Sequence, residues 1–570
     1  MKDIQESQLK GLFYFLAIRS PKKVFLSIII GVIGGAAYSL MIPFVLLSIT
    51  QDTDYFLETI EQDEFMLFGY EIVQFEFAVS FLMLCAFILV TRSMAQWLFQ
   101  NVVIESINEL RVYFCQRVNQ LPIINLEKIG EAELTASLTN DVPGVVSGAA
   151  VFPILLTNVA TLLGILGFLI VLNAEVFVFV LCIILIGVVT YRLPIHFSQK
   201  YFAQARRVFS HIIEDFNAII GGAKELKLHS KRRNVFMEEA LLVHVKENTR
   251  LQKKGRVIDI FATNYGNMIS FITIGIVAFV IANAHDLSNE ALIGIIMALL
   301  YTVGPVAAIL NSISSYVQGS ISLQRLRYLL SVMPVEALES QAPVADFKQI
   351  TLKDVVHSYD GDDSFTVGPI NLTFKAGQIS FLIGGNGSGK STLSKVVTCH
   401  YQPNRGEVWF GEQLIGASNL ESARQYISAI YTDFYLFTQL FGMSEKQLDQ
   451  VDLYLKELRL DQVVSINNGK FSSTRLSDGQ RKRLALLVAF LDDRKVYLFD
   501  EWAADQDPIF KEFFYRQLLP KLKEQGKIVL VISHDDKYFD CADQLIRLGE
   551  GNVQSVQRNN HVSKPAGVLS

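Results

Sequence analysis

Long apolar runs dominate the first 316 residues of the chain. Six of them occupy residues 24–49, 77–100, 149–172, 176–194, 258–283 and 291–315. At about 1.5 Å of rise per residue, a helix formed by any of these runs crosses about 30 Å of hydrocarbon. The pattern therefore predicts six membrane-spanning helices, and an even number returns the chain to the side on which it started.

Lysine and arginine are unevenly divided among the loops between these runs. Residues 51–76, 173–175 and 284–290 contain neither, whereas residues 101–148 and 195–257 contain many. Because cytoplasmic loops carry the excess of positive charge, we expect these two long loops and both chain ends in the cytoplasm. Their helical periodicity predicts helices that extend into the cytosol and meet at short turns, near residues 130–142 and 223–227. These turns have two interpretations. They either contact a soluble domain or present a solvated charged surface.

Two features flank the first run. Residues 3–18 are mildly amphipathic and precede Arg-Ser-Pro-Lys-Lys, so residues 1–23 are expected to form an elbow helix on the cytoplasmic face. A cleaved signal peptide is disfavoured, because the run at 24–49 is far longer than the apolar part of such a peptide. The loop that follows carries only negative charge. A solvated acidic loop is preferred there over a site for a cationic peptide or metal, formed by Asp52, Asp54, Glu58, Glu61, Asp63, Glu64 and Glu71.

Composition supports a membrane protein. Hydrophobic residues make up 51% of the 570 residues, charged residues 19%, and the mean hydropathy is +0.32, which is too apolar for a soluble chain of this length. The net charge of −5 comes without a basic tract, so no nucleic-acid partner is expected. The five cysteines lie far apart, which indicates neither a disulfide framework nor a metal site.

After residue 316 the pattern becomes that of a soluble domain. We predict a transmembrane domain at 24–316, a linker at 317–347, a soluble domain at 348–558 and a flexible tail at 559–570. Short apolar runs predict buried strands, at residues 350–357, 370–374, 379–383, 495–501 and 528–533.

A phosphate-binding motif follows the strand at 379–383. Residues 384–392 read Gly-Gly-Asn-Gly-Ser-Gly-Lys-Ser-Thr, which fits G-x-x-x-x-G-K-[ST] between a strand and a helix. Backbone N–H groups of such a loop, together with the positive end of the next helix, converge on phosphate oxygens. The motif predicts that the chain binds a nucleoside triphosphate with Mg²⁺, through Gly384, Asn386, Gly387, Ser388, Gly389, Lys390, Ser391 and Thr392. Lys390 is expected on the β- and γ-phosphates and Ser391 on Mg²⁺.

Two other strand ends carry candidate catalytic groups. Asp500 and Glu501 end the strand at 495–501, and His534 follows the strand at 528–533. An Asp in this position holds Mg²⁺, and a Glu beside it acts as general base on the attacking water. His534 is expected to contact the γ-phosphate.

Residues Leu476–Gln480, which read Leu-Ser-Asp-Gly-Gln, resemble the L-S-G-G-Q signature of ATP-binding cassette (ABC) transporters. The resemblance covers essentially the whole chain and implies an exporter half-transporter of type IV: a polytopic α-helical membrane domain fused to an α/β P-loop ATPase domain. It implies that Leu476, Ser477, Asp478, Gly479 and Gln480 bind the γ-phosphate held by an opposite subunit. It also assigns Tyr359 to the adenine, Asp507 to the D-loop, Asp500 to Mg²⁺, and the catalytic and switch roles to Glu501 and His534.

Residues 367–372, 381–393, 500–508 and 532–539 look like the bacterial branch that exports microcins, syringomycin-type lipopeptides and pyoverdine precursors. Trp502, where most exporters of the family have alanine, is the departure that marks this branch. Two further departures change individual assignments. Tyr431, Thr432 and Asp433 replace the usual glutamine segment, so Thr432 or Asp433 is the candidate ligand to Mg²⁺ and water, unless that ligand is missing.

Asp478 replaces a signature glycine and would bring a carboxylate near a bound γ-phosphate. Like charges at about 4 Å cost roughly 4 kcal/mol at an effective dielectric near 20. Arg481, Lys482 and Arg483 are the candidates to screen this repulsion. We expect an active ATPase with a slow basal rate.

One phosphate loop and one signature per chain imply a homodimer, because each ATP site needs both motifs from opposite chains. The expected function is ATP-driven export of a cyclic or modified peptide across the bacterial inner membrane by alternating access. A flippase for lipid or lipid-linked precursors and a regulatory membrane ATPase are the alternatives. Arg92, within the second span, is the candidate contact to an anionic or carbonyl-rich cargo, with snorkelling to the interface as its alternative. Asn264, Asn267 and Asn311 are further cavity candidates, with hydrogen bonds between helices as the alternative.

Overall fold

The computed structural model describes residues 11–50, 66–67, 70–71, 75–281, 289–336, 342–359 and 365–559. The chain divides into two compact units. Unit 1 contains residues Met1–Phe114 and Thr135–Ser331, and unit 2 contains Cys115–Leu134 and Val332–Ser570. Most of the expected acidic loop, residues 1–10 of the expected elbow helix and residues 560–570 of the expected tail lie outside the described residues. The described part of that elbow is helix α1 (Leu12–Arg19).

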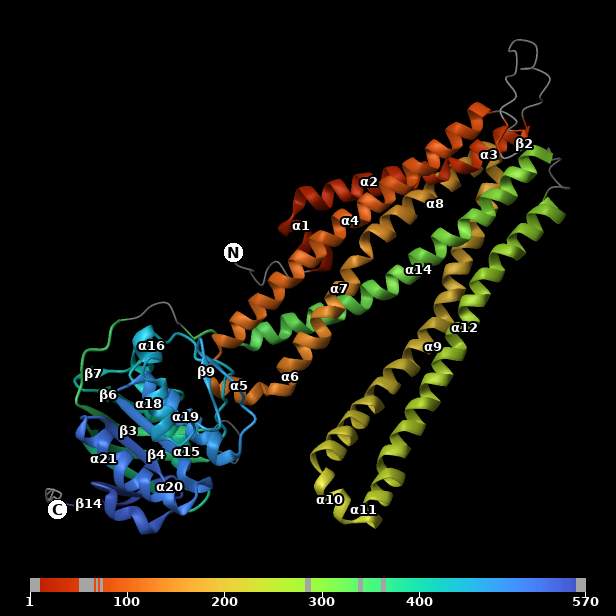
Figure 1. The fold of residues 1–570 in the computed structure, drawn as a ribbon. Coiled ribbons are helices and arrows are strands. Elements are labelled where there is room, and N and C mark those ends of the chain that lie inside the picture. The colour runs from red at the N-terminus through yellow and green to blue at the C-terminus, as the bar shows by residue number, and fades with distance from the viewer. Residues whose placement is uncertain are drawn as a thin grey trace. The chain divides into compact units, whose positions relative to one another are not determined.

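Unit 1 is built from long helices, and the expected six spans are confirmed (Figure 1). The helices long and apolar enough to cross a membrane cover Pro21–Leu46, Phe77–Asn119, Glu131–Leu172, Ala174–Gly221, Ser230–Ile281 and Asn289–Val332. The corresponding elements are α2 (Pro21–Ser39), α3 (Met41–Thr50), α4 (Phe75–Asn119), α6 (Glu131–Ala136), α7 (Val142–Ala150), α8 (Phe152–Leu172), α9 (Ala174–Gly221), α11 (Ser230–Val235), α12 (Leu242–Ile276) and α14 (Asn289–Val332).

The helices continue well beyond the apolar runs, as the periodicity of the charged loops predicts. Helices α9 and α12 run side by side and are joined by the short helices α10 (Ala223–Leu228) and α11 (Figure 1). π-Helical turns interrupt the rods at Ser137–Asp141, Phe236–Leu241 and Val277–Ile281. The first span is not one continuous helix, because a turn at Leu40 separates α2 from α3.

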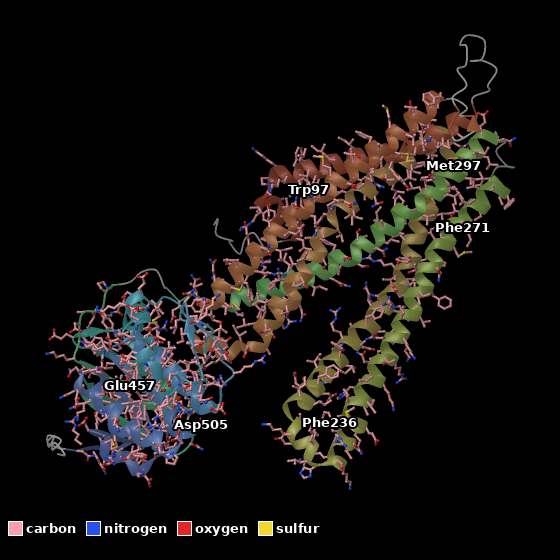
Figure 2. The ribbon with its side chains drawn as sticks, in the orientation of Figure 1. Trp97, Phe236, Phe271, Met297, Glu457 and Asp505 are labelled. Atoms are coloured by element: carbon pink, nitrogen blue, oxygen red, sulfur yellow. The ribbon has the colours of Figure 1, made fainter. Side chains whose placement is uncertain are left out.

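Glycines allow the closest helix contacts in unit 1. A side-chain carbon on Gly35 would lie 2.4 Å from the carbonyl oxygen of Thr157 on α8. One on Gly148 would lie 2.5 Å from the Cα of Gly319, where α7 crosses α14. Small residues of this kind let helix backbones approach in membranes. Large apolar side chains such as Trp97 and Phe271 are exposed instead (Figure 2), as expected for a surface that meets lipid.

Unit 2 contains two principal sheets. The larger has the strand order β14-β13-β5-β12-β11-β8, in which only the edge strand β14 is antiparallel to its neighbour. Its strands are β5 (Gln378–Ile383), β8 (Ile427–Ile430), β11 (Val496–Asp500), β12 (Ile528–Ile532), β13 (Gln544–Gly549) and β14 (Asn552–Arg558). The smaller antiparallel sheet has the order β4-β3-β6-β7, from β3 (Gln349–Ser358), β4 (Thr366–Lys375), β6 (Arg405–Phe410) and β7 (Gln413–Leu414).

Helices and short hairpin strands complete unit 2. They are α5 (Ile123–Ile129), α15 (Lys390–Val397), α16 (Leu420–Arg424), α17 (Glu445–Leu448), α18 (Val451–Glu457), β9 (Ile466–Asn467), β10 (Lys470–Phe471), α19 (Asp478–Asp492), α20 (Pro508–Phe513) and α21 (Leu519–Glu524). The buried strands β11 and β12 are apolar at nearly every position, as is typical of parallel strands covered on both faces. Helix α5 lies between the second and third long helices in sequence, yet it packs Ile123 and Ile124 onto the core of unit 2.

Candidate functional site

Three parallel strand ends create the site in unit 2. β12 lies between β5 and β11, with Ile532 paired to Leu382 on one side and to Asp500 on the other. The carboxyl ends of adjacent parallel strands meet at one edge of a sheet, where ligands of such folds bind. The phosphate loop, the Asp500–Glu501 pair and His534 are therefore brought together by topology alone.

The phosphate loop has the geometry that its sequence predicts. Gly387 and Gly389 have φ values of +75° and +97°, a region that residues with a side chain rarely adopt. Lys390 is buried, and its Nζ donates 2.9 Å hydrogen bonds to the carbonyl oxygens of Gly384 and Gly385. Burial lowers the pKa of Lys390, and the nearby Glu501 and Asp500 carboxylates act in the opposite direction.

A buried hydroxyl in the same loop fits a phosphate ligand. The Ser388 hydroxyl has no hydrogen-bond partner in the described part of the chain, and buried polar groups are normally paired. An acceptor oxygen of a bound phosphate would supply that partner. The loop residues present in this chain therefore suit a nucleoside triphosphate.

The two carboxylates beside the loop differ in environment. Asp500 is buried at the end of β11. Burial, followed by repulsion from Glu501, raises the pKa of Asp500 from 3.8 to about 6, while Lys390 acts against this rise. Glu501 is more open, and its Oε1 lies 3.1 Å from Nε2 of His534. The structure thus places the two predicted catalytic groups within contact of each other.

Other predicted ATP contacts lie around this centre. The Tyr359 hydroxyl is 3.0 Å from the Thr392 hydroxyl, which ties the end of β3 to the first turn of α15. Ser391 lies in that same turn and is exposed. In the segment that replaces the usual glutamine, Thr432 and Asp433 are both exposed. Asp433 is near enough to contribute to the raised pKa of Asp500.

The signature segment forms a capped helix start. Ser477 is the N-cap of α19, where its side chain accepts from the Gln480 N–H at 3.3 Å and Gln480 accepts from the Ser477 N–H at 3.1 Å. Leu476 packs against the core of unit 2. Asp507 is likewise an N-cap, because its carboxylate accepts from the Phe510 N–H at the start of α20.

Of the three cations proposed to screen Asp478, one lies beside it. Arg481 Nη1 is 4.0 Å from the Asp478 carboxylate, whereas Lys482 pairs with Asp505 and Arg483 lies over the Phe510 ring. Asp478 also occupies the first turn of α19, where the helix dipole favours negative charge. Gly479 fits tightly, since a side-chain carbon there would lie 2.9 Å from the Asp505 carbonyl oxygen.

A polar contact that sequence reasoning missed joins α5 to the phosphate-loop helix. The Glu127 carboxylate accepts from Lys395 Nζ at 2.7 Å and from the Tyr401 hydroxyl. Although burial works to raise it, these two donors hold the pKa of Glu127 below its usual value. Glu127 lies more than 250 positions before its partners, so no local pattern signals the pairing. The related signal in the sequence is the predicted turn near residue 130, for which contact with the soluble domain is one of the two interpretations.

The predicted cavity residues of unit 1 are not brought together. The Arg92 guanidinium lies 4.5 Å from the centre of the Tyr38 ring and donates to the Thr161 hydroxyl at 3.3 Å. These contacts keep Arg92 within the helix bundle, beside a pocket that also includes Met41, Cys85 and Gln96. Asn311 lines a different pocket, and Asn264 is exposed on α12. The side chain of Asn267 lies outside the described residues.

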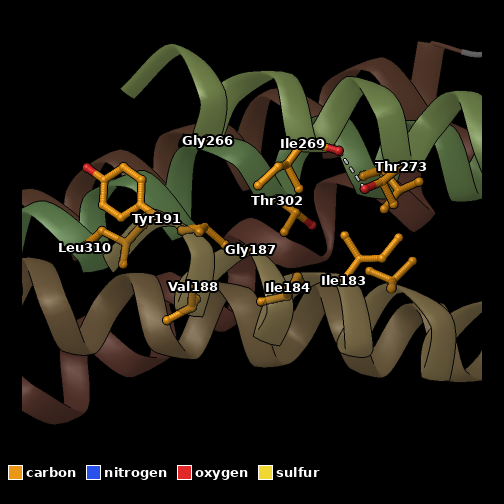
Figure 3. A pocket seen from close by; sticks show the side chains of 13 residues that line it. Ile183, Ile184, Gly187, Val188, Tyr191, Gly266, Ile269, Thr273, Thr302 and Leu310 are labelled. Carbon is orange, nitrogen blue, oxygen red and sulfur yellow. Dashed lines mark hydrogen bonds between the residues drawn. The ribbon is translucent and has the colours of Figure 1, made fainter. Parts of the chain in front are cut away.

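The pocket beside Asn311 continues into a mainly apolar one between α9, α12 and α14 (Figure 3). The apolar pocket encloses about 70 Å³. Tyr191 and Leu310 lie at one end, and Ile183 and Thr273 at the other (Figure 3). Gly187 and Gly266 lie between them and leave the space open.

Comparisons with known proteins agree with this arrangement. The sequence pattern of the ABC transporter family matches residues 367–504. The ATP-binding protein SyrD of Pseudomonas syringae pv. syringae is 33% identical over 466 residues, which cover 78% of this chain and 82% of the relative. The alpha-hemolysin translocation ATP-binding protein HlyB of Escherichia coli is 26% identical over 304 residues, covering 50% of this chain and 42% of that protein.

A solved structure shares the fold over nearly the whole length. A bacterial Atm1-family ABC exporter with ATP bound superposes with a TM-score of 0.73 at 16% identity, covering 95% of each chain. The SyrD match is close and long enough to establish the family, and the six spans make the chain a multi-pass membrane protein. The chain is a member of the ABC transporter family, a half-transporter with the ATP-binding and ATPase domain of an exporter fused to six membrane helices.

Proposed function

We propose that the protein exports a cyclic or modified peptide, of the microcin, lipopeptide or peptide-siderophore class, across the bacterial cytoplasmic membrane. The observation that carries this proposal is the intact cluster of phosphate loop, Asp500, Glu501 and His534, with Glu501 and His534 3.1 Å apart. An ATPase complete in these groups favours driven transport over a regulatory sensor. Relatives named for alpha-hemolysin translocation and subtilin transport favour a peptide cargo.

We assign each site residue one role. Lys390 would leave the loop carbonyls to bind the β- and γ-phosphates, and Tyr359 would stack on adenine. Ser391 and Asp500 would hold Mg²⁺, whose charge would offset that of the phosphates. Asp433 is preferred to Thr432 as the additional ligand to Mg²⁺ and water, because its negative charge contributes to the raised pKa of Asp500. Glu501 accepts a proton from the attacking water, and His534 contacts the γ-phosphate.

We place the unit-2 domain in the cytoplasm and propose a homodimer. Each chain carries one phosphate loop and one signature, so two copies supply two complete sites with Ser477 facing the partner's γ-phosphate. ATP then favours the closed pair of domains, and hydrolysis returns the cavity to the cytosol. Such a cycle requires that each nucleotide state bind one conformation better than the other.

The direct test is transport into inside-out vesicles that contain the full chain. We expect ATP-dependent uptake of at least one member of a panel of labelled cyclic peptides and peptide siderophores. Vesicles with Glu501→Gln serve as the control and should show none. Peptide uptake that does not depend on ATP would contradict driven export.

A flippase predicts a different result in the same vesicles. ATP hydrolysis would then rise with added phospholipid, and no peptide in the panel would be taken up or change the hydrolysis rate. That outcome would replace peptide export by lipid translocation as the function.

The pocket of Figure 3 supports a cargo with an apolar part. We expect Gly187→Val to fill this space, because an added carbon meets only Ile269, at 3.4 Å. For a transported peptide with an aliphatic group, the KM of uptake should rise about tenfold, the usual loss for removing about 1.4 kcal/mol of binding. Gly275→Val is the matched control, since nothing lies within 4 Å of a side-chain carbon there. Equal KM values for both variants would remove the pocket from the transport path.

A further inference from the structure

Lys482 is a buried cation that no step of the proposed hydrolysis uses. It lies on α19, two residues after the signature, and its side chain is only 8% exposed. Its Nζ donates to the backbone carbonyl oxygen of Glu501 at 3.0 Å and lies 2.6 Å from the Asp505 carboxylate. Burying an ammonium group is costly unless its partners are well placed.

Glu501 needs support at this point in the chain. Its φ is +49°, a left-handed conformation that is unfavourable for a residue with a side chain and persists only when neighbours enforce it. The Glu501 N–H donates to the Ile532 carbonyl oxygen at 3.0 Å. The Lys482 ammonium holds the carbonyl on the other side of the same residue, so both peptide groups that set its direction are fixed.

The contact between the two segments is reciprocal. The carbonyl oxygen of Lys482 accepts from the Trp502 indole N–H at 2.8 Å. Trp502 is buried and stacks on Phe514, with ring centroids 4.4 Å apart. Lys482 therefore receives a hydrogen bond from the residue after Glu501 and gives one to Glu501 itself.

The ion pair with Asp505 does not by itself explain a buried lysine. The Asp505 side chain is 52% exposed, so water screens its charge and weakens the ion pair. The hydrogen bond to the Glu501 carbonyl oxygen, in contrast, requires Lys482 to lie in this buried position.

We propose that Lys482 is a positioning residue that holds the strained backbone of Glu501 and so aims its carboxylate at the attacking water. The inference rests on the proposed role of Glu501 as general base. The proposal also gives Trp502 a role. Its indole N–H binds the Lys482 carbonyl oxygen and so anchors the helix turn that carries Lys482.

The test compares Lys482→Met with Lys521→Met in the full chain. Lys521 pairs with Glu457 on the surface of the same unit, so the chemical change is the same. Phosphate release is divided by the number of ATP molecules bound per chain, which removes any effect of unfolded protein. We expect Lys482→Met to lower this kcat by at least about tenfold, since misplacing a catalytic group by about 1 Å costs up to about 10²-fold. Its KM for ATP should change by less than about twofold, and Lys521→Met should match the wild type.

Asp505→Asn separates the two partners of Lys482. It removes the ion pair and leaves the hydrogen bond to the Glu501 carbonyl, so it should retain at least about half of the wild-type kcat. A wild-type kcat per bound ATP in Lys482→Met, or an equal loss in Asp505→Asn, would overturn the proposal. Failure of the underlying assignment is distinct, because it appears as full turnover in Glu501→Gln.

Discussion

Replacing Glu501 by glutamine should stop ATP turnover and leave ATP binding intact. The substitution keeps the size of the side chain and its contact distance to His534, which is 3.1 Å in the structure, and removes only its ability to accept a proton. General bases of this kind contribute about 10²–10⁴-fold, so phosphate release should fall by at least about 100-fold. Equilibrium binding of ATP should stay within about twofold, because Lys390, Ser388 and Tyr359 are unchanged.

Glu512→Gln is the control for this substitution. Glu512 is half exposed in the same unit and pairs with Arg516 and Lys537, so its amide should leave turnover unchanged. Wild-type phosphate release by Glu501→Gln would reject Glu501 as the base. A loss of ATP binding would show instead that the carboxylate supports the nucleotide site itself.

Replacing Asp500 by asparagine should stabilise the nucleotide-free protein while abolishing hydrolysis. The pKa of Asp500 rises from 3.8 to about 6 in the fold, chiefly because the carboxylate is buried and next because Glu501 is adjacent. At neutral pH the Asp500 carboxylate is ionised, although its burial in the folded protein disfavours this charge. One pKa unit corresponds to about 1.4 kcal/mol, so asparagine should raise the free energy of unfolding by about 2–3 kcal/mol.

The pH dependence of this gain has a definite sign. Between pH 3.8 and about 6 the folded state binds more protons at Asp500 than the unfolded state does, so the wild type loses stability as pH rises through this window. The gain from asparagine should therefore be complete above about pH 7 and shrink as pH falls below 6. Thermal unfolding of both proteins without nucleotide, at pH 7.5 and pH 5, measures it. Asp461→Asn, at an exposed position, should show no such gain, and a destabilised Asp500→Asn would refute the argument.

The sequence predicts those parts of the protein that local chemistry determines. The phosphate loop, the strand that precedes it and the acidic strand end are each encoded within about ten residues, and the parallel sheet places their ends together. The six spans follow from apolar length alone. The proposed catalytic cluster therefore follows from local motifs and sheet topology.

Contacts between distant segments could not be predicted in this way. Glu127 pairs with Lys395 across 268 positions, and Lys482 reaches the Glu501 carbonyl from a helix whose basic residues look interchangeable in the sequence. The sequence marks Arg92 only as a charged residue within a span. Its position against Tyr38 and Thr161 depends on how three helices pack. The turn at Leu40 is different, because Pro43 lacks the N–H that would bond the Ser39 carbonyl oxygen and so marks the turn in the sequence.

The position of α5 has a practical consequence for dividing the chain. Ile123 and Ile124 cover part of the core of unit 2, and Glu127 satisfies Lys395 and Tyr401. A recombinant fragment cut at the boundary suggested by sequence, residues 348–558, would leave this patch bare and its lysine without a counter-charge. We therefore expect a fragment that also carries residues 115–134 to be more stable than residues 348–558 alone.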